Sequence, residues 1–139
     1  MTSVQFQGKY AQAELILTKA LDIRRRVEGT EHPDTLFSMN MLGLLYLYAG
    51  KYGQAEAMLT KVLEVRRRIL GEEHPDTITS RNNLALLNER QGRSEQAADL
   101  FTKVLESRRR LLGADPYAGR FHRAGLNRFE TARLGRKGQ

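Results

Sequence analysis

The sequence predicts an all-α solenoid of stacked antiparallel helix pairs, because it repeats itself at a fixed distance and its apolar residues follow helical spacing. The segment at residues 10–35 returns at residues 52–77, and a shorter third copy runs through residues 94–116. Residues 10–51 and 52–93 are identical at 23 of 42 positions. Units of this length bury their apolar faces only by stacking on their neighbours.

Five helices are expected from the spacing of the apolar residues and from the glycines that follow each helical pattern. In the first of them, Tyr10, Ala13, Leu17 and Leu21 lie on one helical face. Gly43 falls inside the second helix, where its counterpart is Ala85, and this small residue predicts close helix packing. The five ranges are 10–27, 35–49, 52–70, 76–91 and 94–112.

Turn signals separate these helices. Gly8 and Lys9 correspond to Gly50 and Lys51, so we expect a turn at residues 8 and 9, with residues 1–7 as the end of a preceding helix. The run from His32 to Thr35 contains a proline, which tolerates the first helical turn, and Asp or Thr side chains that can accept hydrogen bonds from free N–H groups. We therefore expect the second helix to start there.

The composition is that of an ordinary folded protein, except for the distribution of charge. The chain has a formal net charge of +7 and no cysteine. Residues 111–139 hold six basic and two acidic side chains, a net of +4, so most of the basic character lies in the tail. We expect a repeat array over residues 1–117 and a basic tail over 118–139, forming a degenerate cap helix or disordered. Without a signal peptide or a long apolar run, a cytoplasmic protein is expected.

The repeat contains a characteristic set of small, aromatic and apolar residues, namely Leu42-Gly43, Tyr46, Gly50-Lys51-Tyr52, Ala55, Leu59 and Val62-Leu63. This set resembles the tetratricopeptide repeat. The 42-residue period, with linkers that end in His-Pro-Asp-Thr at residues 32–35 and 74–77, is similar to the kinesin light chain subtype. The resemblance implies a right-handed superhelix in which the first helix of each pair lines a concave groove. It further implies a scaffold that takes a partner peptide or helix into that groove.

Projecting the second and fourth helices gives the residues expected to line the groove. If Leu42 and Tyr46 face the core, an adjoining apolar face is left exposed, and such a face usually marks an interaction site. The asparagines on it would hold a peptide backbone, as the resemblance implies for the matching positions. The predicted partner-binding residues are Phe37, Asn40, Met41, Leu44, Leu47, Tyr48, Thr79, Asn82, Asn83, Leu86 and Glu89.

Other interpretations of these residues stay open. The apolar face could pack against an adjacent repeat, and open ends of the array could lead to self-association as a homo-oligomer. Asn40 and Asn82 stand where repeats that clamp chaperone tails would have lysines, so a terminal carboxylate ligand is disfavoured. The tail arginines interleave with Phe121 and Phe129, which would suit nucleic acid, but partner binding in the groove is favoured.

No enzyme, cofactor or metal is predicted. The sequence has no phosphate-binding loop, nucleophile motif or metal-spaced cluster. His32 and His74 lie in turns without a neighbouring histidine, so a structural role at the start of a helix is expected. The arginine runs at 24–26, 66–68 and 108–110 fan around their helices, and each follows an acidic residue at a spacing that favours ion pairs on a solvated surface.

Overall fold

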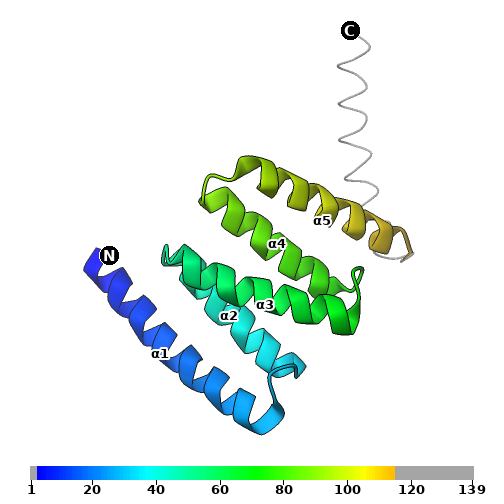
Figure 1. The fold of residues 1–139 in the computed structure, drawn as a ribbon. Coiled ribbons are helices and arrows are strands. Elements are labelled where there is room, and N and C mark those ends of the chain that lie inside the picture. Colours follow the sequence, from blue (N-terminus) through cyan, green and yellow to red (C-terminus); the bar gives the residue numbers. More distant parts are fainter. Residues whose placement is uncertain (1–2, 115–139) are drawn as a thin grey trace. The chain divides into compact units, whose positions relative to one another are not determined.

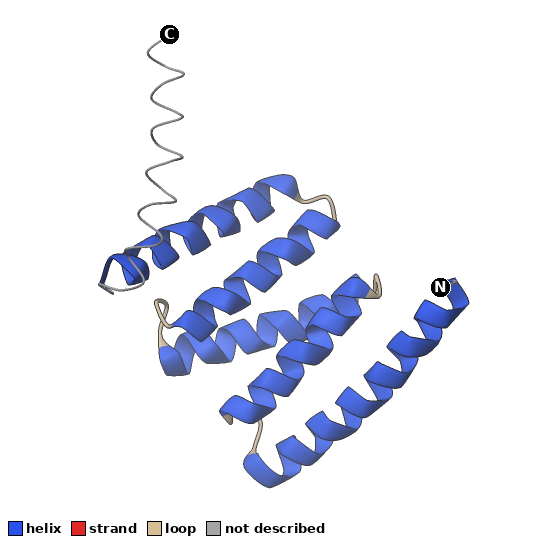
Figure 2. Ribbon diagram, turned by 180° about the vertical axis from the view of Figure 1, so that it is seen from behind, coloured by secondary structure: helices blue, strands red, loops and turns tan. Residues whose placement is uncertain are grey.

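A computed structural model of the chain describes residues 3–114, which form five α-helices and no strand (Figures 1 and 2). This confirms the predicted all-α repeat fold. The bounds predicted for the last four helices differ from the observed ones by two residues at most. The helices are α1 (Ser3–Glu28), α2 (Pro33–Tyr48), α3 (Tyr52–Leu70), α4 (Pro75–Arg90) and α5 (Ser94–Ala114).

The chain divides into two compact units, residues 1–104 and residues 105–139. The first unit contains α1 to α4 and residues 94–104 of α5, and all residues of the candidate site belong to it. The expected boundary between repeat array and tail, at residues 117 and 118, lies outside the described residues. The helix or disorder expected for 118–139 lies outside them as well.

The first helix is longer than expected. Gly50 and Gly92 have φ values of +80° and +78°, and the chain turns there to start α3 and α5. Gly8 occupies the same place in the repeat, but α1 runs through it from Ser3, so the predicted turn at residues 8 and 9 is wrong. The turn at Gly50 lies between two full helices that pack on each other, whereas Gly8 is not among the glycines with positive φ and continues α1.

The core of the first unit lies between successive helices, which run antiparallel (Figure 1). One buried apolar cluster joins Leu21 of α1, Leu42 of α2, Leu59 of α3 and Leu87 of α4. Each of these side chains is at most 2% exposed. The helices are therefore held by contacts with the elements next to them, as expected for a repeat array.

Gly43 allows α2 to approach α3 closely. A Cβ added at this position would lie 2.8 Å from Cδ2 and 2.9 Å from Cγ of Leu59, and 3.2 Å from Cβ of Met58. Leu59 is 1% exposed, so it has no free space into which to move. This confirms that the small residue inside α2 serves close packing.

Histidines cap the helices that follow the turns. Nδ1 of His32 accepts a hydrogen bond of 3.1 Å from the backbone N–H of Asp34, and Nδ1 of His74 accepts one of 3.0 Å from Asp76. Pro33 and Pro75 occupy the first helical positions, as predicted. The structural role expected for the two histidines is confirmed, although the cap is the imidazole and not the Asp or Thr side chain.

Substitution of Gly43 by valine tests the close approach of α2 and α3. The added side chain would overlap Leu59, so Gly43→Val should lower the free energy of unfolding by about 2 kcal/mol. Urea denaturation measures the loss. Gly53→Val is the control, because a Cβ added at Gly53 meets nothing within 4 Å. A similar, small effect of both substitutions would contradict the packing described here.

Candidate functional site

A stripe of apolar side chains runs along one face of α2. Phe37, Met41, Leu44 and Tyr48 follow one another at spacings of four, three and four residues, so they lie on one side of the helix. Phe37 is 60% exposed, Met41 40% and Tyr48 49%, while Leu44 is partly buried. These four residues, named here the α2 stripe, were all among the predicted partner-binding residues.

Four further predicted residues lie on α4 and are at least partly accessible. Thr79 and Glu89 are exposed, and Asn82 and Leu86 are partly buried. At the end of the stripe, the Arg90 guanidinium lies over the Tyr48 ring, with its Cζ 5.2 Å from the ring centre. This cation–π contact joins α2 to α4 and leaves half of the Tyr48 surface open.

Two of the asparagines that were predicted to bind a partner form a hydrogen bond with each other. Nδ2 of Asn83 donates a 2.9 Å hydrogen bond to Oδ1 of Asn40, and both residues are buried, at 7% and 8% exposed. The expectation that both present free amides to a peptide backbone is therefore wrong. A buried amide without a partner would be unfavourable, and each satisfies the other across the α2–α4 contact. Asn82 remains partly accessible.

Leu47 does not lie on the open face. It is fully buried and belongs to the apolar cluster of the core, so its expected place on the groove surface is wrong. Helical projection placed it beside Tyr48, but the side of α2 next to Tyr48 is covered by the core. Of the eleven predicted residues, Asn40, Leu47 and Asn83 are thus part of the packing between helices.

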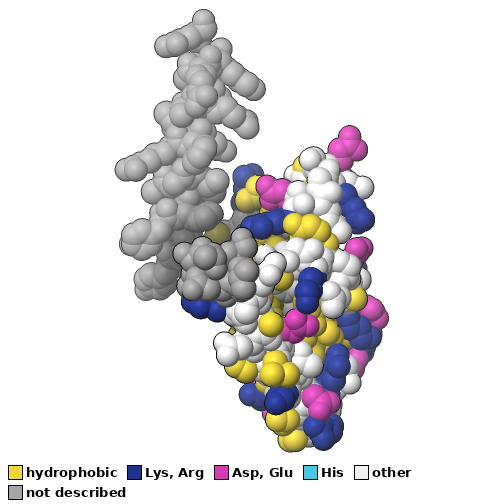
Figure 3. Space-filling view, turned by 90° about the vertical axis from the view of Figure 1, so that its left-hand side faces the viewer, with side chains coloured by type: hydrophobic (Ala, Val, Ile, Leu, Met, Phe, Trp, Pro, Cys, Tyr) yellow, Lys and Arg dark blue, Asp and Glu magenta, His cyan; other side chains and the backbone are white. Residues whose placement is uncertain are grey.

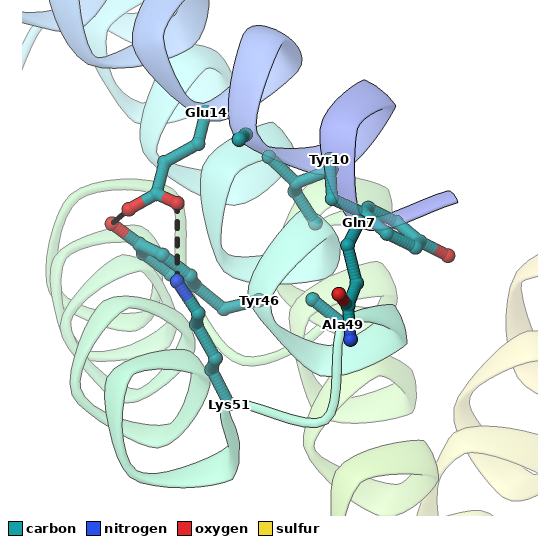
Figure 4. Close-up of a pocket in the computed structure, with 8 residues that line it drawn as sticks. Gln7, Tyr10, Glu14, Tyr46, Ala49 and Lys51 are labelled. Atoms are coloured by element: carbon teal, nitrogen blue, oxygen red, sulfur yellow. Dashed lines mark hydrogen bonds and ion pairs between the residues drawn. The ribbon is translucent and has the colours of Figure 1, made fainter. Parts of the chain in front are cut away.

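A cleft of about 280 Å³ lies between α1 and the end of α2 (Figure 4). The Glu14 carboxylate accepts a 3.1 Å hydrogen bond from the Tyr46 hydroxyl and pairs with Nζ of Lys51 at 3.2 Å. Burial and the interaction with Glu14 raise the pKa of Tyr46 above its ordinary value. One repeat later, Glu56 pairs with Arg93 at 3.8 Å in the same way. The ion pair in the cleft is therefore a feature of the repeat.

The arginine runs are only partly solvated. Arg26 pairs with Asp22 as predicted, and Arg67 pairs with Glu72. Arg66, however, is only 7% exposed and donates hydrogen bonds to the backbone oxygen of Asp76, at 3.3 Å, and to Oγ of Ser80, at 2.9 Å. Its assignment to a solvated surface is wrong.

Burial lowers the pKa of Arg66, and the Asp76 carboxylate counteracts this effect. Arg66 thus ties the end of α3 to the beginning of α4. Arg81 of α4 is buried as well, and it donates a 2.6 Å hydrogen bond to the backbone oxygen of Glu72 and pairs with the Glu72 carboxylate. Sequence reasoning missed both roles. For Arg66 the sequence did contain a usable signal, because Arg24 and Arg66 each stand ten residues before an aspartate, Asp34 and Asp76.

Glu28, His32 and Asp34 bring their ligand atoms within 4.8 Å of one another, but their contacts indicate a structural cluster. Nδ1 of His32 already accepts the N–H of Asp34. The Arg24 guanidinium pairs with Glu28 at 3.2 Å and with Asp34 at 3.1 Å, so it compensates both carboxylates. An ion-pair cluster at the start of α2 accounts for all three residues.

Among the described helices, none combines the length and the apolar character that a membrane span requires. A family model described as "Tetratricopeptide repeat" matches residues 3–67 and 48–110. The chain belongs to the tetratricopeptide repeat family. Repeats of this family generally mediate protein–protein interactions and are generally not enzymes. None of the curated proteins matches the sequence.

Solved structures of kinesin light chain-like tetratricopeptide repeat proteins are similar to the chain. One, with nearly identical TPR-like repeats from Podosopora anserina, has a TM-score of 0.67 and 25% identity over 77% of the chain and 51% of that structure. BtubC (BKLC) from P. vanneervenii has a TM-score of 0.70 and 22% identity, over 95% of the chain and 59% of that structure. The tetratricopeptide repeat chain thus spans between half and three-fifths of their lengths.

The bond between Asn40 and Asn83 makes a testable contribution to stability. Asn40→Ala removes the partner of a buried amide, so it should lower the free energy of unfolding by about 1–3 kcal/mol in urea denaturation. Asn82→Ala, at a partly accessible position, should change it by less than about 0.5 kcal/mol. Replacing both Asn40 and Asn83 by leucine should recover most of the loss. No recovery in the double variant would argue against the pairing.

Proposed function

We propose that the chain is a scaffold that binds a peptide or helix of a protein partner along the α2 stripe and the neighbouring face of α4. The observation that supports this most directly is the exposure of Phe37, Met41 and Tyr48 on one helical face. Contiguous exposed apolar surface of this kind marks interaction sites in soluble proteins.

Positions that are equivalent in α2 and α4 have similar exposure, which supports ligand binding over packing between repeats as the role of this face. Phe37 and Tyr48 are exposed in α2, and their counterparts Thr79 and Arg90 are exposed in α4. Leu44 and its counterpart Leu86 are both partly buried. These positions stay open even where a neighbouring repeat is present, so stacking of repeats does not account for their exposure. They support a face that remains available to a ligand in a stacked array.

The chemistry of the groove indicates an amphipathic ligand. Phe37, Leu44 and Tyr48 offer apolar anchor points at intervals of about two helical turns or less. Asn82 and Thr79 add donors and acceptors for a peptide backbone, and Glu89 and Arg90 place opposite charges at one end. We infer that apolar side chains of the partner lie on the α2 stripe while its polar groups face α4.

Peptides that are selected from a display library for binding to the chain provide a probe for this groove. The double substitution Phe37→Ser and Tyr48→Ser should weaken a selected peptide by at least about tenfold, or about 1.4 kcal/mol, in isothermal titration calorimetry. Removing apolar anchors from a contact face has effects of this size.

A double variant outside the groove serves as the matched control. Val27→Ser with Ile69→Ser removes two side chains that are 77% and 51% exposed at equivalent positions of α1 and α3. It should leave the affinity unchanged. If the two double variants bind alike, the peptide uses another surface and the proposed groove is not its site.

A further inference from the structure

The turn between α1 and α2 carries a threonine where the turn between α3 and α4 carries a glutamate. Thr30 and Glu72 are 42 residues apart, so they hold the same position in the repeat. Glu72 pairs with two arginines: its Oε1 lies 2.7 Å from Nε of Arg67, and its Oε2 contacts the guanidinium of the buried Arg81. The second turn is therefore tied to the end of α3 by a carboxylate that the first turn lacks at this position.

The two turns have the same backbone. Gly29 and Gly71 have φ values of +91° and +92°, and the N–H of each donates a 3.1 Å hydrogen bond to the carbonyl oxygen four residues earlier. The histidine caps that follow have φ values of −64° and −66°. The Cβ of Thr30 thus occupies the same place in its turn as the Cβ of Glu72.

The arginine on the first turn that matches this pairing has no counter-charge. Arg25 is the counterpart of Arg67 and, like it, is exposed in the last turn of its helix. Both neighbours of Arg25 in the sequence, Arg24 and Arg26, pair with carboxylates. Within residues 3–114, no carboxylate pairs with Arg25 itself. The first turn therefore holds the basic half of the ion pair without the acidic half.

The exposure of Thr30 does not depend on where the sequence begins. Its counterpart Glu72 follows α3, on which α2 is stacked through Gly43, and the Glu72 side chain is still 55% exposed. The Arg67 side chain is 49% exposed in the same surroundings. A further repeat stacked before α1 would therefore leave Thr30 and Arg25 accessible.

We propose that Thr30 is a phosphorylation site of an arginine-directed protein kinase and that Arg25 binds the resulting phosphate. Thr30 is the only serine or threonine in the turns of residues 3–114. In the transfer, Oγ of Thr30 forms a bond to the γ-phosphorus of ATP, and the bond from that phosphorus to the oxygen that bridges to the β-phosphate breaks. ADP leaves with the electron pair, and the catalytic aspartate of the kinase takes the hydroxyl proton.

Phosphothreonine matches glutamate in reach and exceeds it in charge. In both side chains the anionic oxygens are bonded to the third atom after Cα, which is Cδ in glutamate and phosphorus in phosphothreonine. The phosphate carries a charge of about −1.5 to −2 at pH 7. It would pair with Arg25 as Glu72 pairs with Arg67, and so tie the first turn to the end of α1. Because Thr30 is not part of the α2 stripe, this inference is independent of the proposed function.

The end of α1 presents the arginines by which such a kinase selects its substrate. Arg25 and Arg26 precede Thr30 by five and four residues, and charge patterns of this kind determine kinase specificity. Figure 3, which looks at the side where α1 lies in Figure 1, shows basic, acidic and hydrophobic side chains next to one another at its lower end, where α1 ends. Val27 is 77% exposed, so few contacts oppose local unwinding of this last helical turn.

The site is tested on the full 139-residue chain with ATP, Mg²⁺ and a recombinant arginine-directed kinase. Tandem mass spectrometry should place phosphate on Thr30. Arg25→Ala with Arg26→Ala should lower the initial rate at this site at least about fivefold. Lys19→Ala with Lys61→Ala, which removes two exposed charges from α1 and α3, is the matched control and should leave the rate unchanged. Absence of phosphate on Thr30, or the same rate in both double variants, would overturn the proposal.

The pairing with Arg25 has readouts of its own. In ³¹P NMR, the phosphate should titrate at a lower pH in the phosphorylated wild-type chain than in Arg25→Ala, because a nearby positive charge favours the dianion. Without any kinase, Thr30→Glu should raise the melting temperature by about 2 °C, and Arg25→Ala should remove that gain. Thr30→Gln, of the same length but uncharged, should give no gain. Equal titration with and without Arg25, or equal gains from glutamate and glutamine, would show that Arg25 does not bind the phosphate.

Discussion

The contact between α2 and α3 through Gly43 is the constraint on which the first unit depends. Leu59 approaches the α2 backbone more closely than any Cβ would allow, and this approach brings Leu42 and Leu59 into one buried cluster. The hydrogen bond between Asn40 and Asn83 then joins α2 to α4, which also packs on α3. The α2 stripe is the part of the α2 surface that these contacts do not cover, so its exposure is a consequence of the packing.

The sequence predicted most of the fold because the determinants of the helices are local and repeated. Helical spacing, the prolines at 33 and 75 and the glycines after each helix are sufficient to place four of the helices within two residues. Gly8 shows the limit of this reasoning. It is followed by the same Lys-Tyr pair as Gly50, yet the backbone turns at Gly50 and remains helical at Gly8. A turn is stabilised by the packing of the helices on either side of it and not by the glycine alone.

The candidate site was predictable in part. Phe37 and Tyr48 follow from helical projection, which depends only on positions along one helix. Projection gives no information about the neighbouring helix. It could not show that Asn40 would accept a hydrogen bond from Asn83 of α4 or that Leu47 would be buried. Arg66 was misassigned for the same reason, since its partners, Asp76 and Ser80, lie on the next helix. Pairwise contacts between helices need the three-dimensional arrangement.

The histidine caps of α2 and α4 affect how a repeat chain of this kind can change its length. Each 42-residue block contains the imidazole and proline that begin its own leading helix, and α2 and α4 use the same pair of residues. A duplicated block therefore carries the residues that cap its own leading helix and needs no change in the residues on either side. Gene duplication in units of this period would preserve the local chemistry at every joint, while side chains on the open faces remain free to diverge toward different ligands.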